Sequence, residues 1–283
     1  MSRPTAIVTG GARGIGRATV ELMLREGWRV AATARDAAAA RDALGDAGDL
    51  AVIPLDLTDT ARIPGAMDEA MEYLGHVDCL VDNAGHALMG AADDTDFDAV
   101  RAMFQANFFG AAEATAHVLP AMRARGRGTV VAVSSVGARF SNALLGYYHA
   151  SKYAMTAWAE SMRVENSRHG IRVHLIEPGM VNTEFPLATR VTGALARGEG
   201  DHVATLAQLR QGFAAWRARP DVTTAEDVAA TILAAATDPS TPFRVVVGGD
   251  AREMADARAA LDDDAFHRWL CGFLGIDPGP TLG

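Results

Sequence analysis

The chain has 283 residues, of which 49% are hydrophobic and 22% charged, and its formal net charge at pH 7 is −9. We expect neither nucleic acid nor a membrane as a partner, because phosphates and anionic lipids repel acidic protein and no apolar stretch is long enough to span a bilayer. The two cysteines, Cys79 and Cys271, suit a reducing compartment without disulfides, which predicts a cytoplasmic protein.

Short apolar runs alternate with helical patterns along the whole chain. The predicted strands are the continuously apolar segments 4–9, 28–34, 50–55, 77–82, 128–134, 171–177 and 243–247. The predicted helices are 14–26, 37–45, 60–74, 96–125, 146–169 and 226–237. Continuously apolar strands are typical of a parallel sheet that is covered on both faces. We therefore expect one α/β domain over residues 1–283, with a doubly wound, mostly parallel, seven-stranded sheet and helices on both faces.

The first predicted strand runs into a glycine-rich turn, Thr9–Gly16, and a helical pattern follows it. This combination favours a dinucleotide phosphate site, because glycines let the backbone come close and the helix N-terminus offers free N–H groups. A tight structural turn is the alternative for such a segment taken alone. Cleavage of a signal peptide would remove this strand and turn, so we expect none. The predicted contacts come from Gly10, Arg13, Gly14, Ile15 and Gly16.

The end of the second predicted strand indicates which dinucleotide is bound. Proteins that prefer NAD place an acidic residue there to bind both ribose hydroxyls. This chain has Ala34 followed by Arg35, and Arg13 supplies a second cation. Two guanidinium groups suit a 2′-phosphate, so we predict that NADP(H) is preferred and that NAD(H) is possible. The alternative is that both are ordinary surface arginines.

Lys152 is the only lysine in the chain and follows Tyr148 by four residues. On a helix this spacing places the ammonium group and the phenol on one face. A positive charge beside a phenol lowers its pKa, which makes the tyrosine usable as an acid or base. The alternative is an ordinary surface lysine.

Together these residues resemble the short-chain dehydrogenase/reductase superfamily, in its short single-domain branch, over about residues 4–250. The resemblance covers motifs in the family's order: Thr9–Gly16, Asp82-Asn83-Ala84-Gly85 (with Asp82 replacing the family's first asparagine), Asn107, Ser135, Tyr148-x-x-x-Lys152 and Pro178–Thr183. It implies a Rossmann-type oxidoreductase that transfers hydride between a nicotinamide and a carbonyl or alcohol carbon.

The resemblance also implies the roles of four catalytic residues. Tyr148 would exchange a proton with the substrate oxygen, and Ser135 would hydrogen-bond that oxygen. Lys152 would bind the nicotinamide ribose and keep the pKa of the phenol low. Asn107 would kink its helix and position a water that links Lys152 to solvent; a tolerated polar residue is the alternative.

Further cofactor contacts are implied at three strand ends. Asp56 would contact the adenine, although it could equally cap the next helix. No metal site is expected. The other implied contacts are Leu57, Asn83, Ala84, Gly85, Pro178, Gly179, Val181 and Thr183.

The substrate is expected to be a small carbonyl or alcohol compound with a mostly apolar body. The segments expected to line its pocket carry Leu88, Met89, Phe140, Leu144, Leu145, Met180, Phe185 and Leu187. His86 and His149 flank the site, as substrate contacts or as packing residues. Residues 184–225 are predicted to form a substrate lid, because they lack clear strand or buried-helix character.

The C-terminal extension, 251–283, carries an apolar face at helical spacing that must be buried against the domain or another subunit. A homodimer or homotetramer is expected. The alternative functions are an NAD-dependent alcohol dehydrogenase and a non-catalytic dinucleotide-binding regulatory protein.

Overall fold

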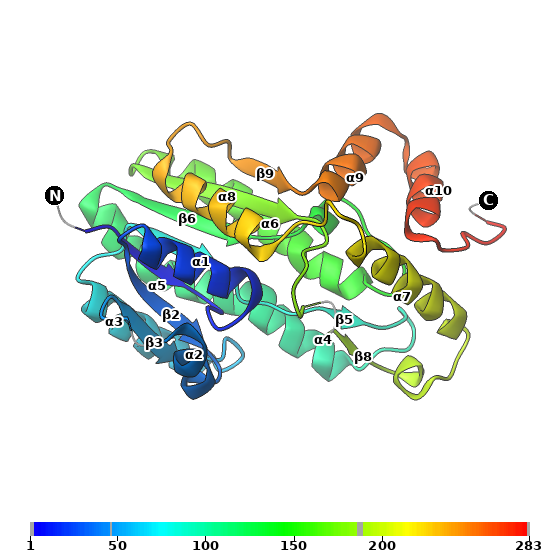
Figure 1. Cartoon of the computed structure of the whole chain (residues 1–283), viewed down its shortest axis with the longest axis horizontal. Coiled ribbons are helices and arrows are strands. Elements are labelled where there is room, and N and C mark those ends of the chain that lie inside the picture. The colour runs from blue at the N-terminus through cyan, green and yellow to red at the C-terminus, as the bar shows by residue number, and fades with distance from the viewer. Residues whose placement is uncertain (1–2, 46, 186–188, 282–283) are drawn as a thin grey trace.

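Within residues 3–45, 47–185 and 189–281, which the computed structural model describes, seven parallel strands form the main sheet (Figure 1). Their order is β3-β2-β1-β4-β6-β7-β9, and each coincides with one of the seven predicted strands. Their bounds are β1 Thr5–Val8, β2 Arg29–Ala34, β3 Leu50–Pro54, β4 Cys79–Asp82, β6 Gly128–Val133, β7 Ile171–Pro178 and β9 Arg244–Val247. The predicted fold class is therefore confirmed.

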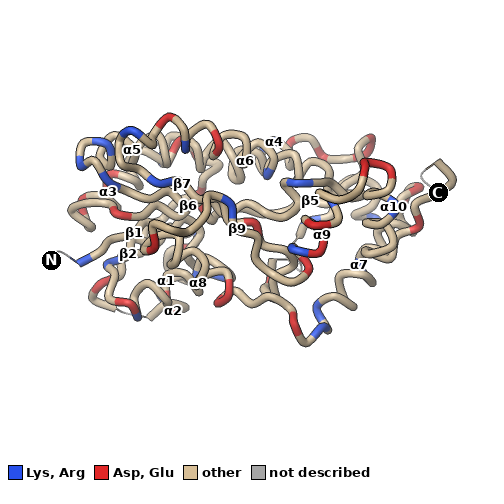
Figure 2. Tube along the Cα trace, turned by 90° about the horizontal axis from the view of Figure 1, so that it is seen from above, with Lys and Arg blue, Asp and Glu red and all other residues tan. Residues whose placement is uncertain are grey.

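Helices cover both faces of this sheet because successive side chains along a strand point to opposite faces. Ile7 packs in one core and its neighbours Ala6 and Val8 pack in the other. Figure 2 shows α3 and α5 on one side of the sheet and α1 and α8 on the other. The helices flanking the sheet are α1 Gly14–Arg25, α2 Ala37–Leu44, α3 Ile63–Leu74, α5 Gly110–Arg125, α6 Gly146–Ser167 and α8 Ala225–Thr237.

The predicted single helix 96–125 is wrong in one respect. It consists of α4 Phe97–Phe104, a π-helical turn η2 at Gln105–Phe109, and then α5. A π turn has i→i+5 hydrogen bonds in place of i→i+4, and the amino-acid composition does not reveal it. Such turns are frequent at functional sites. The kink expected at Asn107 is thus a π turn.

The predicted lid 184–225 contains more regular structure than expected. A short strand β8, Arg190–Val191, pairs with β5, Leu88–Met89, and α7 follows at Val203–Arg217. Three side chains in α7 are buried: Leu206, Leu209 and Trp216. Residues 186–188, including Leu187, lie outside the described residues.

The C-terminal extension forms α9, Gly249–Ala260, and α10, Asp263–Leu274. Its apolar face is buried against the rest of the chain, which is the first of the two expected arrangements, burial against the domain or against another subunit. Figure 1 shows α7, α9 and α10 beyond the carboxyl ends of the strands. Among the described helices, none is long and apolar enough to cross a membrane.

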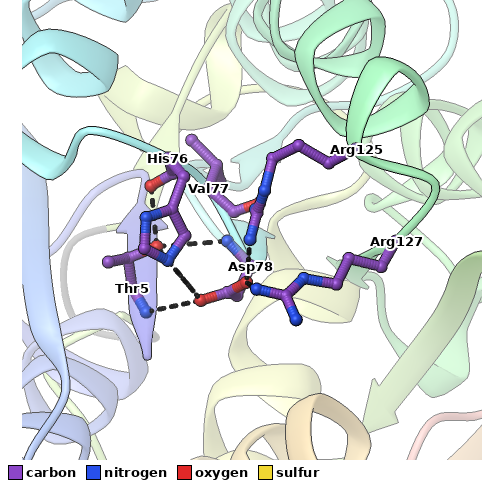
Figure 3. Close-up of polar contacts among 6 residues, drawn as sticks. All are labelled: Thr5, His76, Val77, Asp78, Arg125 and Arg127. Atoms are coloured by element: carbon purple, nitrogen blue, oxygen red, sulfur yellow. Dashed lines mark hydrogen bonds and ion pairs between the residues drawn. The ribbon is translucent and has the colours of Figure 1, made fainter. Parts of the chain in front are cut away.

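The amino end of the sheet is held together by a polar cluster around Asp78 (Figure 3). Its carboxylate accepts hydrogen bonds from the Thr5 backbone at 3.1 Å and from the Arg125 guanidinium at 2.9 Å. His76 lies 3.0 Å from the same carboxylate, and Arg127 lies at 3.8 Å. This cluster joins β1, β4 and the turn after α5, far from the carboxyl ends.

Candidate active site

A cavity of about 670 Å³ lies at the carboxyl ends of the strands. Strand order reverses around β1, whose neighbours are β2 and β4, and doubly wound sheets bind ligands at such a point. The cavity brings together every predicted catalytic residue except Asn107, which lies directly behind the wall. It is also lined by all the predicted cofactor-binding residues except Gly16.

The glycine-rich turn is braced by Asn83 from the end of β4. The Asn83 side chain donates hydrogen bonds to the carbonyls of Thr9, at 3.0 Å, and Gly10, at 3.3 Å. The Thr9 hydroxyl accepts in return from the backbone N–H groups of Asn83 and Ala84. A Cβ at Gly16 would overlap the Gly10 carbonyl, so this turn requires glycine there. Asn83, which is predicted to contact the cofactor, lines the cavity, and its side chain also fixes the shape of the turn.

The start of α1 fits a bound phosphate. Arg13 is the N-cap residue of α1. Among the described residues, its side chain makes no capping hydrogen bond, and the first turn of α1 has no acidic residue. Its free N–H groups and the positive end of the helix dipole therefore face the cavity without an anion of the protein. Arg13 and Arg35 are exposed and both line the cavity. These features fit the phosphates of a bound dinucleotide.

Asp56 has a second role that the sequence analysis did not specify. One of its carboxylate oxygens accepts hydrogen bonds from the Thr58 backbone, at 2.9 Å, and the Thr58 hydroxyl, at 2.8 Å. It thereby fixes the turn after β3 while still lining the cavity. The cap of the next helical turn is Asp59, so the capping alternative for Asp56 is not what the structure shows.

Tyr148 and Ser135 lie beside each other in the cavity wall. Burial raises the pKa of Tyr148 to about 12, and a hydrogen bond with the Ser135 side chain opposes that rise. The Ser135 oxygen also accepts a hydrogen bond from the Gly137 N–H at 3.1 Å, which orients the hydroxyl. The phenol therefore keeps its proton at neutral pH.

Lys152 is buried, with 4% of its surface exposed. Its ammonium group donates a hydrogen bond to the Val133 carbonyl at 3.0 Å, and burial lowers its pKa to about 8. Lys152 is not among the groups that shift the pKa of Tyr148. The expected lowering of the phenol pKa by Lys152 is thus absent from this structure.

Asn107 ties the π turn to the loop after β4. Its amide nitrogen donates to the His86 carbonyl at 2.9 Å and to the Ser151 hydroxyl at 3.0 Å, and its oxygen accepts from the His86 N–H at 2.9 Å. The Ser151 hydroxyl donates in turn to the Tyr148 carbonyl at 2.7 Å. Asn107 and Ser151 are fully buried and link the π turn to the helix that carries the phenol. Sequence reasoning missed Ser151, whose only signal was its place inside the Tyr-x-x-x-Lys segment.

The two candidate histidines differ in their surroundings. His149 is 5% exposed, and burial lowers its pKa to about 4. Its ring nitrogen lies 3.1 Å from the Ser141 hydroxyl. His86 is partly exposed; burial and then the charges of Arg35, Arg13 and Lys152 lower its pKa, while Asp56 opposes them. Both histidines line the cavity and are neutral at pH 7.

The far end of the cavity is apolar. Of the predicted lining residues, Met89, Phe140, Leu145, Met180 and Phe185 line it, whereas Leu88 and Leu144 belong to the packed core. The sequence analysis missed a second group of lining residues from the last third of the chain: Phe213, Trp216, Met254, Phe273 and Leu274. Phe213 and Trp216 lie in the predicted lid, and the signal for Met254, Phe273 and Leu274 was the apolar face of the extension.

The comparisons with known proteins agree with this geometry. The short chain dehydrogenase family model matches residues 4–192, two thirds of the chain. The chain therefore belongs to the short-chain dehydrogenase/reductase superfamily, which makes it a nicotinamide-dependent oxidoreductase by family.

Relatives match over nearly the whole chain. "Oxidoreductase BOA17" of Botryotinia fuckeliana is 28% identical over 265 residues, 93% of this chain and 95% of that protein. A short-chain dehydrogenase from Streptomyces avermitilis has a solved structure with a TM-score of 0.79 and 32% identity, covering 91% of this chain and 95% of its own. Another, from Burkholderia cenocepacia, was solved in complex with NADP; its TM-score is 0.74 at 25% identity, covering 95% and 98%.

Proposed function

We propose that the protein is an NADPH-dependent reductase that converts the carbonyl group of a mostly apolar substrate to an alcohol. The observation that carries this proposal is a partly buried Tyr148 beside Ser135, in a cavity that also reaches the glycine-rich turn and Lys152. The proton donor Tyr148, the hydrogen-bond donor Ser135 and the glycine-rich turn thus line the same cavity.

Each side chain has a definite task in this reduction. When bound, NADPH supplies the hydride to the carbonyl carbon. Ser135, oriented by the Gly137 N–H, donates a hydrogen bond to the carbonyl oxygen and stabilises the negative charge that develops there. Tyr148 transfers its proton to that oxygen. Lys152 would hold the ribose hydroxyls of the bound cofactor.

The cofactor preference rests on charge. Arg13 and Arg35 line the cavity without a carboxylate at the end of β2, where Ala34 stands. A planar guanidinium pairs with phosphate through two hydrogen bonds. The relative from Burkholderia cenocepacia, solved with NADP, is consistent with this preference.

The substrate class rests on the wall formed by the last third of the chain. The rings of Trp216 and Phe273 pack edge to face with their centroids 6.2 Å apart, and Trp269 stacks on Phe273 with a centroid distance of 5.0 Å. With both nearby histidines neutral, this end of the cavity favours an uncharged alkyl or aryl group over a phosphate or carboxylate. The partner is therefore a small molecule.

The test is the oxidation of NADPH in the presence of methyl ketones of increasing chain length and of aryl ketones. The parent enzyme should show rising kcat/KM with apolar size. Tyr148→Phe should lower kcat by about 100-fold or more, since general acid catalysis contributes at least that much. The matched control is Tyr147→Phe, which removes only a hydrogen bond to the Ala92 carbonyl and should remain active.

Three results would contradict the proposal. A parent enzyme that uses NADH better would favour the alternative of an NAD-dependent alcohol dehydrogenase. Tight NADPH binding without turnover of any carbonyl or alcohol would favour a regulatory protein. A Tyr148→Phe variant within a few-fold of the parent would remove Tyr148 as the acid.

A further inference from the structure

A buried carboxylate from the C-terminal extension contacts the Pro178–Thr183 segment. Asp250 lies in the first turn of α9, directly after Gly248 and Gly249, and only 3% of its surface is exposed. One carboxylate oxygen accepts a hydrogen bond from the Met180 N–H at 2.7 Å. This contact joins residues 70 positions apart in the sequence. Neither the family motifs nor the match over residues 4–192 includes Asp250.

The carboxylate also occupies the space that a side chain at position 179 would need. A Cβ at Gly179 would overlap both oxygens and the carboxyl carbon of Asp250. A Cβ at Gly248 would meet an Asp250 oxygen at 2.5 Å. The absence of side chains at both positions therefore makes room for this one carboxylate.

The remaining backbone of the segment is held by neighbouring elements. The Gly179 N–H donates to the Val247 carbonyl at 3.1 Å, and the Asn182 N–H donates to the Thr223 carbonyl at 2.8 Å. The Met180 N–H lies between these two, and Asp250 is its acceptor. Without the carboxylate, the N–H in the middle of the segment would lose its partner inside the wall of the cavity.

The end of this segment lies next to the phosphate-binding turn. The Thr183 side chain lies 3.6 Å from the place where a Cβ at Gly14 would stand. Helix α9 also contacts the turn η3, Val136–Ala138, which directly follows Ser135. One helix thus supports both the segment beside the cofactor and the segment that carries the serine.

We propose that Asp250 is a positioning residue that holds the Pro178–Thr183 backbone against the nicotinamide half of the cofactor, so that binding of this half depends on α9. The inference rests on the proposed function, because it assigns the two ends of the cavity to the two halves of NADPH. The adenosine half contacts the turn and the arginines and is independent of Asp250.

The charge of Asp250 is compatible with this role above its pKa. Burial raises the pKa of Asp250 to about 6; hydrogen bonds from the N–H groups of Met180, Ala251 and Asp250 itself, and the charge of Arg219, oppose the rise. At pH 7.5 the carboxylate is therefore ionised and acts as an acceptor. The binding experiment is made at that pH.

The experiment compares two ligands on the full chain. NADPH reports on the whole cofactor through its nicotinamide fluorescence, and 2′,5′-ADP reports on the adenosine half alone. Asp250→Ala should weaken NADPH binding about tenfold, the loss expected for one hydrogen bond to a charged group. It should also reduce the fluorescence change of the bound nicotinamide. The affinity for 2′,5′-ADP should stay within twofold of the parent.

Two further variants make the result specific. Asp250→Asn keeps an acceptor oxygen in the same shape and should restore a large part of the NADPH affinity. Asp256→Asn removes an exposed carboxylate from the same helix and should behave as the parent. If Asp250→Ala does not fold, Gly179→Ala, which displaces the carboxylate, replaces it in the comparison.

The outcomes separate this inference from the proposed function. Unchanged NADPH affinity in folded Asp250→Ala would overturn the inference, as would an equal loss of both ligands, which indicates general destabilisation. If the parent protein binds NADPH and reduces a ketone with it, either of these results in the variant contradicts the inference alone. A parent that binds neither ligand would contradict the proposed function.

Discussion

At the scale of single residues, the identity of one cation matters most. Of the 26 Lys and Arg residues, only Lys152 is lysine. It is buried, and its ammonium group donates a hydrogen bond to the Val133 carbonyl. A guanidinium is larger and planar and stays charged, whereas burial lowers the pKa of this ammonium to about 8. The surroundings therefore select a compact group.

Lys152→Arg should consequently lower kcat/KM by about 100-fold, because the larger group displaces ribose and phenol from their productive geometry. Steady-state NADPH oxidation with the best ketone of the screen measures this loss. The reverse exchange Arg17→Lys, at an exposed residue paired with Glu21, is the control and should be silent. Normal activity in Lys152→Arg would contradict the role given to the lysine.

A second residue-scale prediction concerns the end of β2. The double variant Ala34→Asp, Arg35→Leu should shift the ratio of kcat/KM for NADPH and NADH toward NADH, by about 100-fold if one charge-assisted contact is exchanged for repulsion. The new carboxylate repels a 2′-phosphate and accepts from free ribose hydroxyls. Arg25→Leu, an exposed arginine at the other end of α1, is the control. An unchanged ratio would leave the two arginines as ordinary surface residues.

Several of the residues that form the site were predictable from sequence, and others were not, for a physical reason. Ser135, Tyr148 and Lys152 belong to short motifs whose spacing survives in any fold of this type. Asp250 and Ser151 act through contacts that exist only after distant segments pack. The direction of the Tyr148 pKa shift was not predictable because it follows from burial, which no spacing reveals.

At the scale of elements, periodicity located strands and helices but not their irregularities. All seven strands were predictable because they are continuous apolar runs. The π turn at Gln105–Phe109 was not, since it is a single i→i+5 turn of five residues inside a longer helical stretch. Helix α7 was missed because only three of its side chains are buried, which gives a weak amphipathic signal.

The junction of β1, β4 and the turn after α5 gives an element-scale prediction. Burial alone would raise the pKa of Asp78, but hydrogen bonds from Arg125 and Thr5 and the charge of His76 outweigh it and hold that pKa below its usual value. A lowered folded-state pKa adds stability above the unfolded value of about 4, and this stability is lost as the pH falls through the folded value.

Asp78→Asn should therefore reduce the free energy of unfolding at pH 7 by about 1 to 3 kcal/mol. The difference from the parent should narrow as the pH falls below about 4. Urea denaturation at pH 7 and at pH 3 measures both quantities, with exposed Asp98→Asn as the control. A difference that is independent of pH would show that the ion pairs of Figure 3 contribute nothing.

At the scale of the whole molecule, the last third of the chain closes the cavity. Helices α7, α9 and α10 share one hydrophobic core with the Phe140 and Leu145 segment, and Phe266 is fully buried in it. Removal of the extension would expose this core, the face of α7 included. Burial of apolar surface contributes about 25 cal/mol per Å², so the loss is large compared with ordinary domain stability.

Truncation after Asp250 should therefore lower the melting temperature strongly and expose apolar surface, detectable by thermal unfolding and by dye binding. Truncation after Asp277 removes only the last residues beyond α10 and should leave the melting temperature unchanged. If both truncated proteins melted like the parent, the extension would be an appendage without structural importance.

The cavity wall that the last third provides has a consequence for how the protein can diversify. The phosphate turn, Ser135, Tyr148 and Lys152 all precede residue 192, where the family match ends, whereas Phe213, Trp216 and Phe273 follow it. Mutations in the later region can reshape what the enzyme accepts while hydride chemistry stays intact. Substrate range and hydride chemistry can therefore evolve at separate rates. Asp250 is the exception, because it lies in the later region and holds the backbone of the Pro178–Thr183 segment in the earlier one.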